Sequence, residues 1–306
     1  MEKRLLENAG VEITSVGFGA MTIGGRFGPV DDNESNRALH AAIDGGMNFI
    51  DMSNAYGEGR SEKIIGRFLA ERTDRHDIKI FTKGGNLMKR GTGGYNRDFS
   101  PEYISVCLEE SLKRLGTEAI DLYLLHNPKT ENMKAEDSYA LLEKMKGVGK
   151  LKTWGVSVNT PEECDLAIEQ RRPSVLEMEY NVLNQEAARS FKRAKAAGGG
   201  VIARVPLKRG FLSGNIDETV KFSEDDMRRR ILTPENIRKY QEKLRRLEDV
   251  AGQLQITPSE AAIRFCVSNP NVTCVIPGVR TEAQAAQNAK CGTPLPSEAV
   301  SRLTAD

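Results

Sequence analysis

Three ionisable side chains end three successive apolar runs of this sequence. Asp51 ends the run NFID, Lys83 ends IFTK and His126 ends LYLLH, while Tyr56 follows shortly after Asp51. Charged groups that point inward from apolar strands cost several kcal/mol unless they are paired or functional. At the carboxyl ends of neighbouring strands of a barrel, such groups converge on one pocket. We therefore take Asp51, Tyr56, Lys83 and His126 as a candidate catalytic group.

Proton donation is the chemistry that suits these four residue types. A tyrosine titrates near ~10 in water, and a nearby ammonium lowers that pKa. Lys83 is expected to do this to Tyr56, and Asp51 is expected to keep Lys83 charged. A neutral His126 can bind a substrate carbonyl oxygen or relay the proton. A general acid with neither a nucleophile nor a metal indicates reduction of a carbonyl group.

Each residue taken alone also has another explanation. Asp51 could cap a turn, Tyr56 could be a loop aromatic and His126 could be a hydrogen-bonded core histidine. Lys83 has a rival function as well, because a lysine at a strand end of a barrel can form a Schiff base with a carbonyl substrate. A Schiff-base aldolase therefore remains open at this point.

Carbonyl reduction needs a hydride donor, but the usual glycine fingerprint of dinucleotide-binding folds is missing. The run GFGAMT has Thr22 where the third glycine of G-x-G-x-x-G belongs, and no G-x-x-x-x-G-K-[ST] run exists. The run IPGVR offers an alternative, because Gly278 allows close backbone approach and Arg280 precedes a helix expected to begin near Thr281. An arginine there suits the extra phosphate of NADPH. An ordinary turn is the alternative interpretation.

Two polar residues of that expected helix share one face. Gln284 and Asn288 are spaced i, i+4, so both could meet an adenine ring. Solvated polar residues on a surface helix would show the same spacing.

Apolar runs and amphipathic stretches alternate along the chain, which is typical of parallel βαβ units. Eight such units predict a (β/α)8 TIM barrel, which commonly needs ~250 residues. We expect one domain over residues 1–306, because no linker is visible. The predicted strands are Ser15–Phe18, Asn48–Ile50, Ile78–Thr82, Ile120–Leu125, Lys152–Val156, Val175–Met178, Gly200–Ala203 and Thr273–Ile276. The predicted helices are Asn33–Asp44, Ser61–Ala70, Pro101–Leu115, Ser138–Lys146, Pro161–Ile168, Ala187–Ala196 and Glu235–Leu254.

Three further segments add to a minimal barrel. Lys3–Leu6 and Val11–Thr14 predict an N-terminal β-hairpin that plugs the barrel floor. Gly84–Asp98 and Leu207–Pro234 both follow strands, so we expect them to be long loops on the catalytic face.

Composition limits the partners. With 44 basic and 43 acidic residues the formal net charge is +1, which indicates neither a nucleic-acid nor a membrane-surface partner. No apolar run spans a bilayer and no secretory signal is visible, so we expect a cytoplasmic protein with a small-molecule substrate. The five cysteines and three histidines show no metal-ligand spacing, so reduced structural thiols and no metal are expected.

Taken together, these motifs resemble those of the aldo-keto reductase superfamily. The runs D-x-x-x-x-Y-G at 51–57, TKG at 82–84, LLHNP at 124–128 and IPG at 276–278 look like its tyrosine, lysine, histidine and cofactor-helix signatures. The resemblance runs from about Leu5 to Asn288, nearly the whole chain. It implies that Asp51, Tyr56, Lys83 and His126 are a catalytic tetrad with Tyr56 as proton donor.

The resemblance also implies cofactor contacts after several strands. The loop that follows strand seven looks like the family loop that straps the pyrophosphate, which would make the basic stretch beyond it a lid on NADPH or NADP+. The implied contacts are Met21, Asp51, Ser157, Asn159, Glu177, Pro206, Leu207, Lys208, Arg209, Gly210, Gly278, Arg280, Gln284 and Asn288.

Three departures from the family pattern alter the expected pocket. Val158 separates Ser157 from Asn159, and Glu177 stands where many members carry glutamine. A carboxylate accepts from the nicotinamide carboxamide but cannot donate to its oxygen. The run MSN at 52–54 replaces the more usual small residue and threonine, which favours a more polar pocket.

The resulting expectation is an NADPH-dependent oxidoreductase that reduces an aldehyde, ketone or keto-sugar to an alcohol. The resemblance also admits a non-enzyme alternative, an NADPH-binding regulatory subunit like the β subunits of potassium channels.

Overall fold

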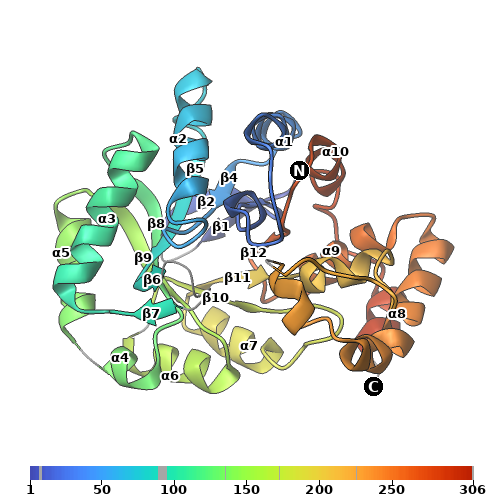
Figure 1. Ribbon diagram of the computed structural model, residues 1–306. Coiled ribbons are helices and arrows are strands. Elements are labelled where there is room, and N and C mark those ends of the chain that lie inside the picture. The colour runs from blue at the N-terminus through green and yellow to red at the C-terminus, as the bar shows by residue number, and fades with distance from the viewer. Residues whose placement is uncertain (7–8, 89–94, 135, 172, 225, 305–306) are drawn as a thin grey trace.

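Eight parallel strands form a barrel surrounded by helices (Figure 1). The computed structural model describes residues 1–306 except 7–8, 89–94, 135, 172, 225 and 305–306. Each strand pairs with the next in chain order, and parallel bridges from Val16 to Val275 and from Gly19 to Gly278 close the ring. The strands are β3 (Phe18–Gly19), β4 (Phe49–Asp51), β5 (Lys79–Gly84), β8 (Ile120–His126), β9 (Leu151–Ser157), β10 (Val175–Glu179), β11 (Gly200–Arg204) and β12 (Cys274–Ile276). The predicted (β/α)8 barrel is confirmed.

A glycine makes the closing seam of the barrel possible. The Gly19 N–H donates to the carbonyl of Pro277 at 3.0 Å, and a Cβ atom on Gly19 would lie 2.7 Å from that same oxygen. Any side chain here would push β3 away from β12.

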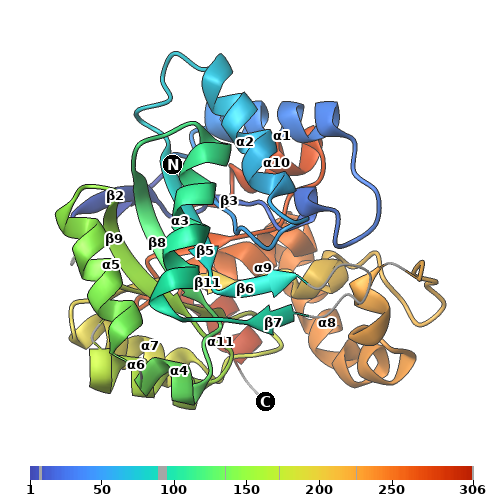
Figure 2. The ribbon, with the colours of Figure 1, turned by 60° about the vertical axis from the view of Figure 1, so that its left-hand side comes forward.

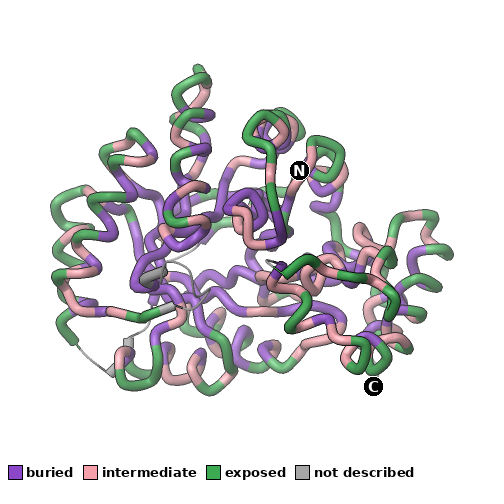
Figure 3. The backbone as a smooth tube through the Cα atoms, viewed as in Figure 1, coloured by how far each residue is buried: buried purple, intermediate pink, exposed green. Residues whose placement is uncertain are grey.

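Helices cover the outside of the barrel, with apolar faces inward and exposed faces outward (Figure 3). Several begin at side-chain caps, as where Ser100 accepts from the Tyr103 N–H. All seven predicted helices are present. The helices are α1 (Asp32–Asp44), α2 (Arg60–Glu71), α3 (Pro101–Leu115), α4 (Thr130–Lys134), α5 (Asp137–Gly147), α6 (Pro161–Arg171), α7 (Ala188–Ala196), α8 (Pro234–Leu254), α9 (Pro258–Val267), α10 (Glu282–Asn288) and α11 (Ser297–Thr304).

The predicted N-terminal hairpin closes the amino-terminal end of the barrel. Strands β1 (Lys3–Leu6) and β2 (Val11–Thr14) pair antiparallel. The side chains of Leu6 and Ile13 are fully buried in one cluster with inward residues such as Phe49 and Phe81. The far end of the barrel is therefore left for the site.

The two long segments after β5 and β11 contain short regular elements among their described residues, which leave out 89–94 and 225. Gly84–Asp98, expected to be a loop, contains a separate antiparallel hairpin of β6 (Asn86–Met88) and β7 (Tyr95–Arg97) that stands apart from the barrel sheet (Figure 2). The segment Leu207–Pro234 contains two 3-10 helices, η3 (Lys208–Ser213) and η4 (Met227–Arg230). In Figure 1 the segment lies beside α8. A third 3-10 helix, η2 (Thr22–Gly24), follows β3.

Two further features bear on the expectations from composition. Each of the five cysteines is a buried free thiol. Within the described residues, no helix is both long and apolar enough to cross a bilayer.

Candidate active site

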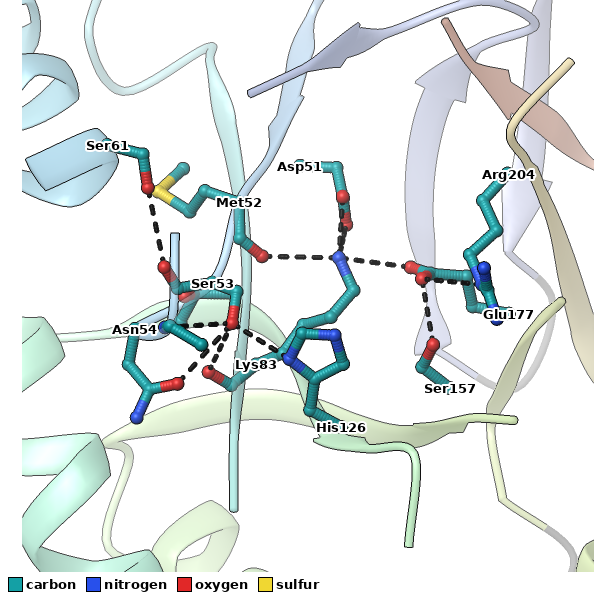
Figure 4. Close-up of polar contacts among 12 residues, drawn as sticks. Asp51, Met52, Ser53, Asn54, Ser61, Lys83, His126, Ser157, Glu177 and Arg204 are labelled. Atoms are coloured by element: carbon teal, nitrogen blue, oxygen red, sulfur yellow. Dashed lines mark hydrogen bonds and ion pairs between the residues drawn. The ribbon is translucent and has the colours of Figure 1, made fainter. Parts of the chain in front are cut away.

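The carboxyl ends of three barrel strands and the middle of a fourth bring ionisable side chains together at one end of the barrel (Figure 4). Asp51 ends β4, His126 ends β8, and Lys83 lies next to the last residue of β5. Glu177 comes from β10, across the barrel. All four are buried, which excludes solvent as their main partner.

Close backbone contact fixes the loop that carries Tyr56. A Cβ atom on Gly24 would lie 2.8 Å from the carbonyl carbon of Tyr56, so the η2 backbone packs directly on this loop. Arg60, the first residue of α2, donates to the carbonyls of Ile23 and Val30. The loop after β3 and the loop after β4 therefore form one packed unit that positions Tyr56.

Lys83 holds two carboxylates at the centre of the site. Its Nζ atom lies 2.5 Å from each oxygen of Asp51 and 3.2 Å from Oε2 of Glu177, and it also donates to the Met52 carbonyl at 3.2 Å. A buried charge needs such partners, because an unpaired one costs several kcal/mol. Two carboxylates thus share one ammonium in a buried cluster, and the Arg204 guanidinium lies 3.8 Å from the other oxygen of Glu177.

This arrangement shifts the pKa values of Asp51 and Lys83. Burial raises the pKa of Asp51 to about 8, with Lys83 opposing that shift and Glu177 adding to it. Burial alone would lower the pKa of Lys83, but the Asp51 and Glu177 carboxylates raise it above its ordinary value. Lys83 is accordingly an ammonium at neutral pH, and the raised pKa of Asp51 favours a proton bound to the cluster.

Tyr56 lies over this cluster and against His126. The Tyr56 ring meets the His126 ring edge to face, with 5.8 Å between centroids, and Lys83 Nζ lies 5.7 Å from the Tyr56 centroid. Burial raises the pKa of Tyr56; the Lys83 ammonium lowers it, and the Asp51 and Glu177 carboxylates raise it further. The expectation of a net lowered pKa for Tyr56 is therefore wrong in this structure, because burial and the two carboxylates outweigh Lys83.

His126 is neutral at the site. Burial lowers its pKa well below the ordinary value, and the positive charges of Lys83 and Arg204 act in the same direction. Its Nδ1 atom lies 2.9 Å from the Ser53 hydroxyl. His126 can therefore make a hydrogen bond to a ligand without carrying charge.

The polar residues Ser157, at the end of β9, and Asn159, just beyond it, have different surroundings. Ser157 is buried and donates to Oε1 of Glu177 at 2.9 Å, whereas Asn159 is exposed and accepts from Arg204 at 3.0 Å. Buried Val158 separates them. Ser157 thus lies with the central cluster, and Asn159 lies at its rim.

The run at 206–210 forms a strained turn above β10 and β11. Lys208 and Arg209 have positive φ angles of 45° and 57°, which non-glycine residues rarely adopt. Lys208 donates to Glu179 at 2.7 Å, and an Arg209 nitrogen lies 3.9 Å from the other Glu179 oxygen. Pro206, Leu207 and Gly210 belong to the same turn, while Met21 directly precedes η2 across the barrel seam.

The Arg280 side chain forms hydrogen bonds within the protein. Its guanidinium donates to the carbonyl of Phe27 at 2.9 Å and to that of Pro29 at 2.8 Å. The side chain therefore lies against the loop after β3. Its own N–H donates to Gln284, and Thr281 caps α10 as expected from the sequence.

The comparisons with known proteins agree with this geometry. The sequence profile of the Aldo/keto reductase family matches residues 15–305. The chain belongs to this family. It is therefore an oxidoreductase, and aldo-keto reductases use NADP(H), which confirms the class of cofactor expected from the sequence.

Individual relatives are moderately similar to this aldo-keto reductase. It is 30% identical over 274 residues to an aldo-keto reductase [NADP(+)] of Schizosaccharomyces pombe, covering 88% of this chain and 80% of that protein. A probable voltage-gated potassium channel subunit beta of Oryza sativa is 27% identical, with 95% and 90% covered. The structure of a glycerol dehydrogenase from Gluconobacter oxydans superposes with a TM-score of 0.86 at 27% identity, covering 98% and 93%.

The rim of the site fits an anionic dinucleotide. Burial lowers the pKa of Arg209, and the neighbouring guanidinium groups of Arg204 and Arg26 lower it further, while the Glu179 carboxylate opposes that shift. Several polar atoms of the described residues are buried without a hydrogen-bond partner, and the Arg209 Nε and Asn288 Nδ2 atoms are two of them. Excess positive charge and unused donors are what a diphosphate and an adenine ring would satisfy.

Two residues at the site were not among the sequence candidates. Arg204 ends β11, pairs with Asn159 and lies 3.8 Å from Glu177. Arg204, like Asp51, is an ionisable residue at the end of a strand, so the same sequence signal could have identified it. The sequence pointed to Ser53 only as part of the unusual MSN run at 52–54. Its contact with His126 could not be predicted, because it depends on how the chain folds.

Proposed function

We propose that this aldo-keto reductase reduces an aldehyde, ketone or keto-sugar with NADPH, with Tyr56 as the proton donor. The observation that carries the proposal is the convergence of Asp51, Lys83, Tyr56 and His126 at one buried end of the barrel. The family membership supports the same reaction class. We also propose that residues 1–306 form one domain, which the family match over 15–305 supports.

The residues divide the work as follows. NADPH, when bound, supplies the hydride. Tyr56 donates its phenolic proton to the carbonyl oxygen as the alcohol forms, and the raised pKa of Tyr56 keeps that proton in place until the oxygen becomes basic. The Lys83 ammonium stabilises the phenolate left behind, and His126 holds the carbonyl oxygen by a hydrogen bond.

The cofactor contacts named from the sequence are part of the proposal. Lys208 and Arg209, with the turn Pro206 to Gly210, would hold the pyrophosphate, and Ser157 and Glu177 would face the nicotinamide carboxamide. Gln284 and Asn288 would meet the adenine ring, and Arg280, beside Gly278, would bind the extra phosphate of NADPH. Met21, Asp51 and Asn159 would also contact the cofactor. The crowding of cations around Arg209 supports the pyrophosphate position.

The buried ion pairs of Lys83 argue against a Schiff-base aldolase. Such an enzyme needs a neutral amine as nucleophile, yet the Lys83 nitrogen donates to both oxygens of Asp51 and its pKa is raised. The second candidate function is an NADPH-binding regulatory subunit, because one relative, from rice, is named as a probable potassium channel subunit beta. A protein with only that role is expected to bind NADPH without consuming it.

Three measurements on the purified protein separate the three functions: consumption of NADPH, binding of NADPH and trapping of substrate by borohydride. Purified protein is mixed with NADPH and a panel of aldehydes, ketones and keto-sugars, and absorbance of NADPH is followed. Consumption of NADPH with alcohol formed in equal amount supports the proposal. Tight NADPH binding without consumption by any carbonyl would indicate the regulatory role, and substrate trapped on Lys83 by borohydride would indicate the aldolase.

A further inference from the structure

Ser53 is a buried hydroxyl that touches the imidazole of His126. It lies in the loop just after β4 and has no exposed surface. Its Oγ atom lies 2.9 Å from His126 Nδ1, and it accepts from the Ala55 N–H at 3.1 Å (Figure 4). The hydroxyl is thus held from its own loop and aimed at the imidazole.

Among the residues that the structure describes, the Ser53 hydroxyl proton has one well-placed acceptor. A serine hydroxyl donates a single hydrogen bond, and the Ala55 N–H already uses one of its acceptor positions. The other acceptors in reach, the Lys83 carbonyl and Asn54 Oδ1, are both 3.4 Å away, which is long for an O–H donor. The Lys83 carbonyl also accepts from the Asn54 N–H. His126 Nδ1 is therefore the favoured partner of the hydroxyl proton.

We propose that Ser53 is a positioning residue that donates to His126 Nδ1 and so keeps the imidazole proton on Nε2. A neutral imidazole carries one N–H, so a nitrogen that accepts from Ser53 leaves the proton on the other. His126 is neutral because burial and the charges of Lys83, Arg204, Arg97 and Arg26 lower its pKa. The Nε2–H can then donate a hydrogen bond.

The consequence for substrate binding rests on the proposed function. A carbonyl oxygen accepts hydrogen bonds, so Nε2–H attracts it, whereas a bare Nε2 would repel it and compete for the Tyr56 proton. The tautomer of His126 thereby decides whether the substrate oxygen is held beside Tyr56. The Ser53 hydroxyl acts on the substrate only through His126.

The tautomer can be measured without any substrate or cofactor. The protein is labelled with 15N-histidine and its imidazole nitrogens are recorded by long-range proton–nitrogen NMR at pH 8. The chain has only three histidines, so His126→Asn assigns the His126 signals by their disappearance. We expect Nδ1 to appear as the unprotonated nitrogen and Nε2 as the protonated one. A protonated Nδ1 in the wild-type protein would overturn the proposal, whether or not the protein reduces carbonyls.

Variants of Ser53 test the cause. Ser53→Ala should mix the two tautomers or move the Nδ1 shift away from its hydrogen-bonded value, and should lower kcat/KM for a carbonyl on the order of tenfold, with NADPH affinity kept. Ser53→Thr keeps the hydroxyl and should restore both readouts. An unchanged His126 spectrum in Ser53→Ala would show that the Ser53 hydroxyl does not set the tautomer of His126.

Ser61→Ala is the matched control. Ser61 is equally buried and donates to the Ser53 carbonyl, but it does not touch His126. It should leave the His126 spectrum as in the wild type. If Ser61→Ala altered the spectrum as Ser53→Ala does, loop packing rather than the Ser53 hydroxyl would set the tautomer.

Discussion

Lys83 Nζ and Glu177 Oε2 lie 3.2 Å apart with essentially no exposed surface on either side chain. Because Lys83 also contacts both oxygens of Asp51, the ammonium is shared between two carboxylates. The position of Glu177 on β10 thus makes it an electrostatic neighbour of the proposed acid as well as a candidate cofactor contact. The substitution Glu177→Gln removes the charge of this side chain and keeps its size and shape nearly unchanged.

We expect Glu177→Gln to shift the alkaline limb of the pH profile for reduction toward lower pH. Reduction needs the protonated phenol, so activity falls as pH rises through the pKa of Tyr56. The Glu177 carboxylate raises that pKa, and its removal must lower it. The measurement is kcat/KM against pH for both proteins.

Glu179→Gln serves as the control for that profile, because Glu179 is on the same strand but pairs with Lys208. The alkaline limb should stay in place. A Glu177→Gln profile that matched the wild type would show that Glu177 and Tyr56 are not coupled.

A second prediction concerns stability against pH. Burial raises the pKa of Asp51 from 3.8 to about 8, so the folded protein binds a proton that the unfolded chain releases. That contribution to stability is complete below the unfolded value and is lost as pH rises through the folded one, with a slope of up to ~1.4 kcal/mol per pH unit between them. Asp51→Asn removes this contribution.

Urea unfolding of both proteins from pH 5 to 8 gives the test. We expect the wild-type free energy of unfolding to fall relative to Asp51→Asn as pH rises. Parallel curves would mean that the cluster binds no extra proton in the folded state.

Lys83→Met should abolish reduction and destabilise the fold together. Without the ammonium, Asp51 and Glu177 are left buried without their shared cation, and breaking a buried pair costs about 3–5 kcal/mol. Lys152→Met is the control, because the Lys152 side chain is 57% exposed and its pair with Asp121 should contribute little. Retained activity with an unchanged pH profile in Lys83→Met would remove Lys83 from the mechanism.

Cofactor choice tests the role proposed for Arg280. A guanidinium that binds the 2′-phosphate contributes roughly 1.5–3 kcal/mol per charged hydrogen bond, so Arg280→Ala should weaken NADPH on the order of tenfold to a hundredfold and barely change NADH. Added salt should weaken NADPH binding by the wild type more than by the variant.

The structure offers a competing role for Arg280, which holds the Phe27 and Pro29 carbonyls. If that role prevailed, both dissociation constants would rise equally in Arg280→Ala. Lys208→Ala, at the expected pyrophosphate contact, should weaken both cofactors alike and provides the comparison.

Much of the fold could be predicted because its signals are local. Apolar runs of strand length alternate with amphipathic helices, and a charged residue after such a run marks a catalytic-face position. Helix α9 was missed because most of its residues, including Phe265 and Val267, are buried, so it lacks a polar face. The β6–β7 hairpin was missed because the glycine-rich stretch Gly84–Asp98 shows no strand alternation.

The residues of the site could be predicted from the sequence, but the directions of their pKa shifts could not. Asp51, Lys83 and His126 come together as their strand-end positions require. The net direction of the Tyr56 pKa depends on burial and on Glu177, which approaches from the opposite side of the barrel. The partners of Arg280 likewise depend on how the loop after β3 folds over the barrel seam.

Tyr56→Phe tests the proposed mechanism most directly. The phenol hydroxyl supplies the proton and its loss removes general acid catalysis, which is typically worth ~10²–10⁴-fold. The ring remains, so packing against His126 and NADPH binding should persist. The measurement is kcat for the best carbonyl substrate together with the NADPH dissociation constant. We expect a fall in kcat within that range at nearly unchanged NADPH affinity, whereas a variant that kept half of the wild-type kcat would show that Tyr56 is not the proton donor.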